Sequence, residues 1–218
     1  MNRKLLAVAA VAAVGVVLNL GTRAAQSGAP QAPFKQLLTP ASCLQPQWPA
    51  EARRYEIEGV TMVRFEIGAD GAIVRPAVAR SSGWRILDEA AVAGIARCRF
   101  QPDLDAARQH TVFPLQYVWK LSGPPMARPL LVQGSCAASA TFAGFSEADP
   151  RPGGRDGILV RFLLSADGTA VRVVPEAAGQ PAALVGAAVD YLQSCRFAHD
   201  SDARGERTDT GYGRVLLK

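Results

Sequence analysis

Four cysteines are the residues of this chain with the clearest chemical potential: Cys43, Cys98, Cys136 and Cys195. Thiolates can bind zinc, but the close Cys-x-x-Cys pairs typical of structural zinc sites are missing. Disulfide bonds are the other use of these thiols, and four cysteines allow three pairings. An internal repeat, described below, favours Cys43 with Cys98 and Cys136 with Cys195. Each bond would close a loop long enough to contribute roughly 4 kcal/mol.

A hydrolytic site is the second chemistry to consider. The two histidines, His110 and His199, both fall in expected loops. Asp200 and Ser201 follow His199, but adjacency in sequence does not create the geometry of a catalytic triad, and a solvated loop is the better account of these residues. The glycine-rich stretch at residues 153–157 has neither the lysine of a phosphate-binding loop nor a helix after it, and is expected to form a turn before a strand. The sequence therefore predicts no enzyme, no metal site and no cofactor.

The elements that would position any site occur twice. VRFEIGADG at residues 63–71 returns as VRFLLSADG at 160–168, and EAAVAGIARCRF at 89–100 returns as GAAVDYLQSCRF at 186–197. Both phrases recur at an offset of 97 positions, which indicates a duplicated domain. The predicted organisation is a leader (1–25), a linker (26–42), a first domain (43–122), a second linker (123–135) and a degenerate second copy (136–218).

The apolar patterns predict the same order of elements, strand, strand, helix and strand, in both copies. In the first copy these elements are expected over residues 60–67, 73–80, 86–98 and 112–121, after a short helix over 50–55. In the second they are expected over 159–164, 169–174, 182–195 and 210–217. The fold class is thus α+β: two tandem domains, each a small antiparallel sheet with one packed helix.

Single residues add further expectations. Phe65 and Phe162 hold matching apolar positions and should be buried. Arg64 and Arg161 hold matching outward positions and are expected on solvated faces, whereas Asp88 is expected to favour the N-terminus of its helix electrostatically. The last strand of the second copy should be the shorter one, weakened by its glycines, Gly211 and Gly213.

The chain begins with MNRK, an apolar run and small residues, a pattern typical of an export signal. The apolar stretch over residues 5–20 is short for a membrane-spanning helix, which needs about 20 residues. Cleavage near Ala24 and retention as a membrane anchor therefore both stay open. The net charge of +5 falls to +2 without residues 1–25, because these hold three of the 24 basic residues and none of the 19 acidic ones. No nucleic-acid partner is expected.

Short motifs through the first copy can be compared with known families. They are PQWPAEA at residues 46–52, ADG in the turn, SSG at 81–83, LDEAA at 87–91 and CRFQP at 98–102. Together they resemble the TonB C-terminal domain over residues 43–121. Trp48 stands where that family usually has tyrosine, and the first cysteine pair is similar to that of a disulfide-bearing branch. The second copy keeps the ADG turn and the CRF ending but lacks the Pro-x-Tyr-Pro phrase.

The resemblance implies a periplasmic protein that binds a partner peptide by strand addition in energy-coupled transport across the cell envelope. Its implied partners are an outer-membrane receptor or other envelope protein, and inner-membrane motor proteins. The first copy should bind, through its last strand and the aromatic phrase; the candidate residues are Trp48, Pro49, Val112, Tyr117, Val118 and Trp119. The apolar run over residues 5–20 lacks the histidine that the family's transducers carry, and residues 26–42 span at most ~60 Å. A soluble periplasmic structural or adaptor protein with no role in energy transduction is therefore the alternative.

Overall fold

The computed structural model describes residues 37–39, 41–101, 111–176 and 179–218, with the side chains of residues 41 and 42 left out. These residues belong to one compact unit. The predicted leader, the segment 5–20 and most of the predicted linker 26–42 lie outside the described residues, as does His110.

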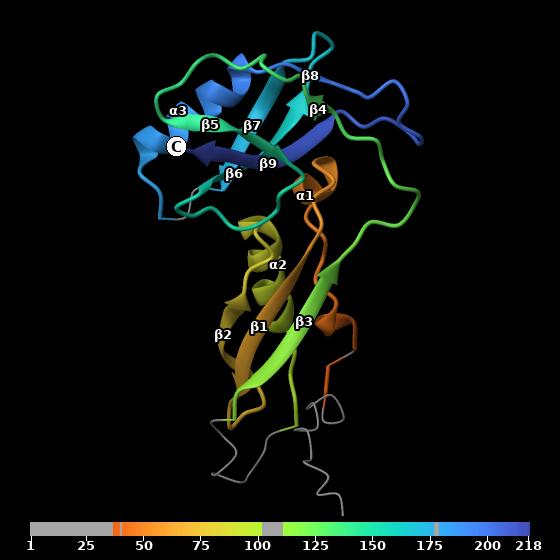
Figure 1. The fold of residues 1–218 in the computed structure, drawn as a ribbon. Helices are drawn as coiled ribbons and strands as arrows, with labels where there is room; N and C mark the ends of the chain where they lie inside the picture. The colour runs from red at the N-terminus through yellow and green to blue at the C-terminus, as the bar shows by residue number, and fades with distance from the viewer. Residues whose placement is uncertain (1–36, 40, 102–110, 177–178) are drawn as a thin grey trace, which may run out of the picture. The chain divides into compact units, whose positions relative to one another are not determined.

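The first half is a three-stranded antiparallel sheet with one helix against it (Figure 1). The strand order is β2-β1-β3, so the first strand of the half lies in the centre. A 3-10 helix, η2, and a short helix, α1, precede the sheet. The elements are η2 (Ala41–Leu44), α1 (Ala50–Arg54), β1 (Gly59–Ile67), β2 (Ile73–Arg80), α2 (Arg85–Ile95) and β3 (Phe113–Trp119).

The second half is a four-stranded antiparallel sheet in the order β5-β9-β6-β7, with α3 packed on it (Figure 1). A separate two-stranded ladder joins β4 to β8. The elements are β4 (Leu130–Leu131), β5 (Phe142–Glu147), β6 (Gly157–Leu164), β7 (Ala170–Glu176), α3 (Ala182–Ser194), β8 (Phe197–Ala198) and β9 (Thr210–Leu217).

The α+β class and the order strand, strand, helix, strand are confirmed in both halves. The alternation in β1 buries Val63 and Phe65 and leaves Arg64 exposed, which is the inward and outward period of a strand. The apolar stripe of α2 is likewise inside. Differences at the ends are small: α2 stops at Ile95, three residues before Cys98, and β3 runs over seven residues, not the ten predicted.

Matching positions in the two halves share unusual backbone details. The turn glycines Gly71 and Gly168, 97 positions apart, have φ of 77° and 80°. Arg75 and Arg172, also 97 apart, both adopt the left-handed region at φ of 50° and 48°, which costs energy for a residue with a side chain. β1 and β6 each have a register shift at the same place in their pairing with the return strand. These shared details favour the predicted duplication.

Both predicted disulfides are present. Cys43 pairs with Cys98 and Cys136 with Cys195, with Cα atoms 5.3 Å and 3.9 Å apart. Phe65 and Phe162 are both 1% exposed, as expected. Each packs on the phenylalanine that follows the second cysteine of its half, at ring-centroid distances of 6.1 Å to Phe100 and 4.7 Å to Phe197. The halves therefore have matching cores.

The expectation that Arg161 lies on a solvated face is wrong, whereas Arg64 is exposed. The Arg161 side chain is 5% exposed and forms ion pairs with Glu51, at 2.7 Å, and with Glu176. Its guanidinium also lies 5.2 Å from the centre of the Tyr55 ring. Glu51 and Tyr55 come from the first half, so this side of the second sheet is covered where the equivalent side of the first is open.

Apolar and polar contacts extend this interface between the halves. Leu159 and Leu163 of β6 join the core of the first half, and Trp84 meets the Tyr212 ring edge to face at 5.5 Å. Arg54 donates two hydrogen bonds to the Asp209 carboxylate, at 3.0 and 2.7 Å. The two halves are therefore packed against each other as well as joined by the chain.

The prediction that the last strand of the second copy is shorter is wrong, since β9 has eight residues and β3 has seven. The reason is β5, which was not predicted. β9 has a strand on each side, β5 and β6, so pairing holds it along its length. β3 pairs only with β1 among the described residues, and Val112 lies just outside it.

Candidate peptide-binding edge

One edge of β3 has no strand beside it in the part of the chain that the structure describes. The other edge pairs with β1 in continuous register, from Gly59 opposite Trp119 to Phe65 opposite Phe113. In an antiparallel sheet alternate residues turn their N–H and C=O groups to opposite edges. The free edge of β3 therefore presents main-chain donors and acceptors to which an extended segment can pair.

Side chains alternate along β3 as expected for a sheet with a helix on one face. Tyr117 and Trp119 are 6% and 4% exposed and face the core, whereas Val118 between them is 63% exposed. The exposed Val118 lies on the other face of the sheet. A segment added at this edge would thus extend an apolar inner face and also meet an apolar residue on the outer face.

A cavity of about 270 Å³ lies beside this strand. One wall is the segment that follows Cys43, and the other is β3. The Trp48 ring meets the Trp119 ring edge to face at 5.9 Å, which closes the inner side. The lining residues are Leu44, Gln45, Pro46, Trp48, Gln116, Tyr117, Val118 and Trp119.

Two residues that line this cavity each have a buried polar atom with no hydrogen-bond partner among the described residues: Trp48 Nε1 and the Tyr117 hydroxyl. Both are buried, and leaving a buried donor unpaired costs about 1–3 kcal/mol. Burial also raises the pKa of Tyr117 to about 12, so the phenol keeps its proton and can donate.

A buried hydrogen-bond chain fixes the β3 end of the cavity. Trp119 Nε1 donates to Thr61 Oγ1 at 3.0 Å, and Thr61 Oγ1 donates to Asp88 at 2.9 Å. Asp88 also accepts hydrogen bonds from Ser82 N and Ser82 Oγ, both at 2.9 Å, and from Ser81 Oγ. Asp88 lies in the first turn of α2, as expected, but its carboxylate ties the helix to β1 and, through Thr61, to β3.

Residues 44–121 match the family model described as Gram-negative bacterial TonB protein C-terminal. This part of the chain is similar to that family. The matched residues include the whole three-stranded sheet and the cavity. A search among curated proteins found no match to the chain. The similarity supports, in general terms, a part in envelope energy transduction.

Within the matched residues 44–121, four of the predicted binding residues gather at the cavity: Trp48, Tyr117, Val118 and Trp119. Two do not line it. Pro49 caps the N-terminus of α1, and Val112 is 53% exposed just before β3.

Sequence reasoning missed the cavity residues Leu44, Gln45, Pro46 and Gln116 as members of the site. Three of them directly precede Trp48 or belong to the PQWP phrase, so the phrase itself was the signal. Gln116 alternates with Tyr117 along β3, and only the pairing of β3 shows which of its edges is free.

The described residues show no assembled catalytic site around His199. Its Nε2 lies 2.8 Å from the Thr208 carbonyl oxygen, to which it can donate. Asp200 instead accepts a hydrogen bond from the main chain of Asp202, and the Ser201 hydroxyl donates to the Asp202 side chain. No group of three His, Cys, Asp or Glu side chains is placed for a metal in this part of the chain. No helix within the described ranges is long and apolar enough to cross a membrane.

Proposed function

We propose that this protein binds an extended segment of an envelope protein by strand addition to the free edge of β3. The observation that carries the proposal is the free main-chain edge of β3 with an aromatic-lined cavity beside it. In this mode of recognition, main-chain hydrogen bonds supply affinity and pockets for alternate side chains supply selectivity.

The cavity suits one side chain of such a segment. A volume of about 270 Å³ can hold a single aliphatic or aromatic group, with Trp48, Tyr117 and Trp119 around it. A ligand acceptor that reached Trp48 Nε1 or the Tyr117 hydroxyl would satisfy a donor that is unpaired among the described residues. Pro49 and Val112 would act at the margins, by orienting Trp48 and by extending the apolar surface.

The proposed partner is an outer-membrane receptor or another envelope protein, and the proposed location is the periplasm. Anchoring by residues 5–20 and contact with inner-membrane motor proteins would make the protein an energy transducer. These two features are tested by the mass of the mature chain and by its partition between membrane and soluble fractions.

A structural or adaptor role without energy transduction is the second candidate. The interface between the halves favours it, because Arg161 and the shared core make one packed unit from two domains. Both candidates use the same β3 edge, and cleavage near Ala24 would favour the adaptor.

The test is a titration of the full chain, followed by amide chemical shifts, with synthetic peptides that cover the periplasmic N-terminal segments of outer-membrane receptors. We expect the largest shifts along residues 113–119 and at the indole of Trp48. A Val118→Pro variant should lose binding, because proline removes a main-chain donor and disturbs the edge. Val78→Pro, on the opposite edge strand β2, is the matched control and should keep it. Shifts centred on residues 210–217, or no response to any peptide, would contradict the proposal.

A further inference from the structure

The last strand of the second half occupies the place that β3 has in the first. β9 pairs antiparallel with β6, as β3 pairs with β1. Its opposite edge, however, is already paired: β5 runs antiparallel to it, with Phe142 opposite Leu217, Phe145 opposite Val215 and Glu147 opposite Gly213. The edge that is free in the first half is therefore filled in the second by residues 142–147 of the same chain.

β5 and one wall of the β3 cavity come from the same place in the two halves. Each follows the first cysteine of its half, Cys43 or Cys136. After Cys43 come Pro46 and Pro49, which lack the N–H that a strand ladder needs. Pro46 packs instead on α2, where a Cβ added to Gly94 would lie 2.8 Å from it. After Cys136 there is no proline until Pro150, so this segment can pair with β9.

We propose that β5 is a tethered strand ligand, and that the edge of β9 is a second strand-accepting site occupied by residues 142–147. The site takes an extended, proline-free segment with two aromatic side chains three residues apart. The comparison with β3 rests on the proposed function, but the separability of β5 from the second sheet can be tested without it.

Two aromatic side chains hold the tethered strand. The Phe145 ring lies 5.9 Å from Phe162 and 5.6 Å from Phe197, and the Phe142 ring lies 5.2 Å from Tyr191. Both phenylalanines are buried. A register shift between Phe142 and Gly144 lets residues three apart reach the same core.

Gly213 allows close packing between β9 and β5, a role that the sequence alone did not indicate. A Cβ added there would lie 2.5 Å from the Phe145 ring and would also collide with the Ser146 carbonyl oxygen. Gly213 thus allows β5 to lie close to β9. The sequence predicted that Gly213 weakens β9. In the structure, its missing side chain instead leaves room for Phe145 and Ser146 of β5.

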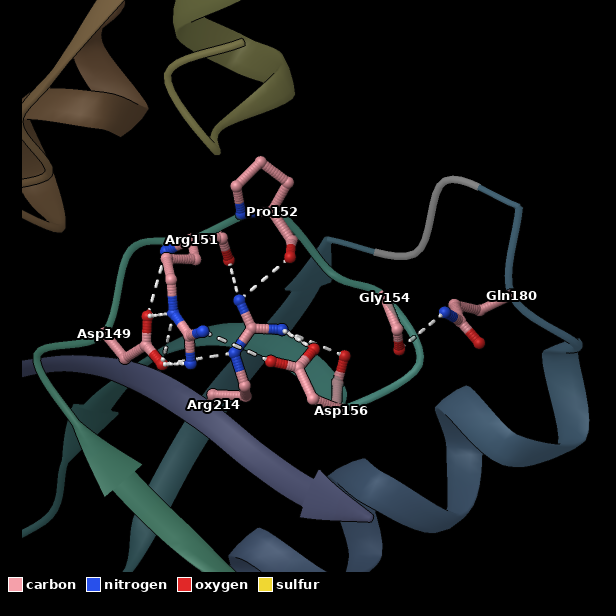
Figure 2. A network of polar contacts seen from close by, with 8 residues as sticks. Asp149, Arg151, Pro152, Gly154, Asp156, Gln180 and Arg214 are labelled. Carbon is pink, nitrogen blue, oxygen red and sulfur yellow. Dashed lines mark hydrogen bonds and ion pairs between the residues drawn. The ribbon is translucent and has the colours of Figure 1, made fainter.

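A buried arginine holds the C-terminal end of β5. Arg214 of β9 is fully buried and its Nε lies 3.2 Å from the carboxylate of Asp149, two residues beyond β5 (Figure 2). Its other nitrogens bind Asp156 at 3.2 Å and the Pro152 carbonyl oxygen at 2.8 Å, and also the Arg151 carbonyl oxygen. Figure 2 shows this loop wrapped around the guanidinium. The loop that leads out of β5 is therefore fixed to the strand that β5 covers.

The N-terminal end of β5 is held as well. The disulfide Cys136–Cys195 ties the preceding segment to the end of α3, and the Lys218 amide donates to the Thr141 carbonyl oxygen at 3.0 Å. A ligand tethered at both ends has a high effective concentration, in the millimolar range for short connections. A free peptide at micromolar concentration cannot displace it.

The first half indicates that the rest of the second sheet can stand without β5. There, three strands, one helix and one disulfide form a complete unit with no fourth strand among the described residues. The corresponding set in the second half is β6, β7, β9, α3 and Cys136–Cys195. We therefore expect β5 to open as a separate unit.

The experiment releases β5 in the full-length chain by the double substitution Phe142→Ser and Phe145→Ser. A synthetic peptide of residues 139–148 is then added and binding is measured by calorimetry. The released variant should bind one peptide and regain slow exchange of the Arg214 main-chain amide, which lies on the β5 side of β9 opposite Ser146, whereas the unaltered chain should not bind. A peptide carrying Phe145→Ser should bind at least about tenfold more weakly, as expected for loss of an aromatic anchor. A released variant that stays folded, with the Arg214 main-chain amide exchanging fast, and binds no peptide would overturn the proposal.

A second measurement covers a released variant that fails to fold. Native-state hydrogen exchange on the unaltered chain should show the β5 amides opening at lower denaturant than those of β6. Simultaneous opening of β5, β6 and β7 would show that β5 is integral to the sheet and would refute the proposal. Binding of receptor peptides at β3 is scored separately in both chains, so loss of that binding contradicts the proposed function and leaves this result unaffected.

Discussion

The edges of β3 and β9 differ in one respect, which is what lies beside them. β3 has a cavity and the proline-bounded segment with Trp48, whereas β9 has β5. The two halves share their turn, their helix and their disulfide, so the difference comes from the dozen or so residues after the first cysteine. Prolines there keep a segment off the sheet, and phenylalanines without prolines attach it. A small change of sequence can thus decide whether the edge of the last strand is open or covered by another strand of the same chain.

The largest expected effect compares the two cores. Phe65→Ala and Phe162→Ala should each lower the free energy of unfolding by about 3–5 kcal/mol, because each empties a fully buried ring position. Only Phe162→Ala should also speed amide exchange in β5, since Phe162 contacts Phe145. Chemical denaturation and hydrogen exchange measure the two effects. If both variants accelerated amide exchange in β5 equally, β5 would open only when the whole chain unfolds.

A smaller effect is expected from the glycine that receives β5. Gly213→Ala should destabilise the second half by about 1–3 kcal/mol, because the added methyl group overpacks against Phe145. Gln116→Ala, on the exposed face of β3, is the matched control and should change stability by less than about 0.5 kcal/mol. Thermal unfolding of both variants provides the measurement, and a neutral Gly213→Ala would show that β5 does not press on β9.

Acid should loosen the closed edge. The hydrogen bond from Arg151, with a further one from Arg214, lowers the pKa of Asp149 to about 2 from an ordinary value of 3.8. Because the pKa of Asp149 is lower in the folded than in the unfolded chain, its ionised carboxylate stabilises the fold above the unfolded pKa of 3.8. This stabilisation, at most about 2 kcal/mol, is lost as the pH falls through the folded pKa of about 2. Stability curves between pH 5 and 1.5 should be flatter for Asp149→Asn. Asp70→Asn, in the first half, should leave exchange of the Arg214 main-chain amide, on the β5 side of β9, unchanged.

The smallest effect concerns the open edge. Tyr117→Phe removes the buried, unpaired hydroxyl and should leave stability equal or slightly higher. If a partner segment accepts a hydrogen bond from that hydroxyl, its affinity should fall about fivefold, equivalent to roughly 1 kcal/mol. Thr61→Val, which breaks the chain from Trp119 to Asp88, is the contrasting variant and should lower stability itself. Calorimetry with a receptor peptide measures the affinity of the Tyr117→Phe variant. An affinity equal to that of the unaltered chain would place the ligand elsewhere along β3.

Much of each half could be predicted because its determinants are local. Period-two alternation in β1 and an apolar stripe in α2 each act over a few residues, and Asp-Gly turns accept positive φ wherever they stand. The disulfides could be predicted only from the repeat. Because each copy contains one pair of cysteines, pairing within each copy was favoured over the two other possible arrangements. The aromatic phrase around Trp48 likewise pointed to most of the cavity.

What only the tertiary structure decided involves groups from distant parts of the chain. β5 escaped prediction because its two phenylalanines, three residues apart, follow neither the strand nor the helix period until a register shift brings both inward. Arg161 was expected in solvent because its strand alternates, but Glu51 lies 110 positions away and buries it. Whether a strand edge is open or closed depends on which other segment pairs with it. The residues of the strand alone do not predict that segment. Local periodicity determines which face of an element is apolar, and packing alone determines what covers that face.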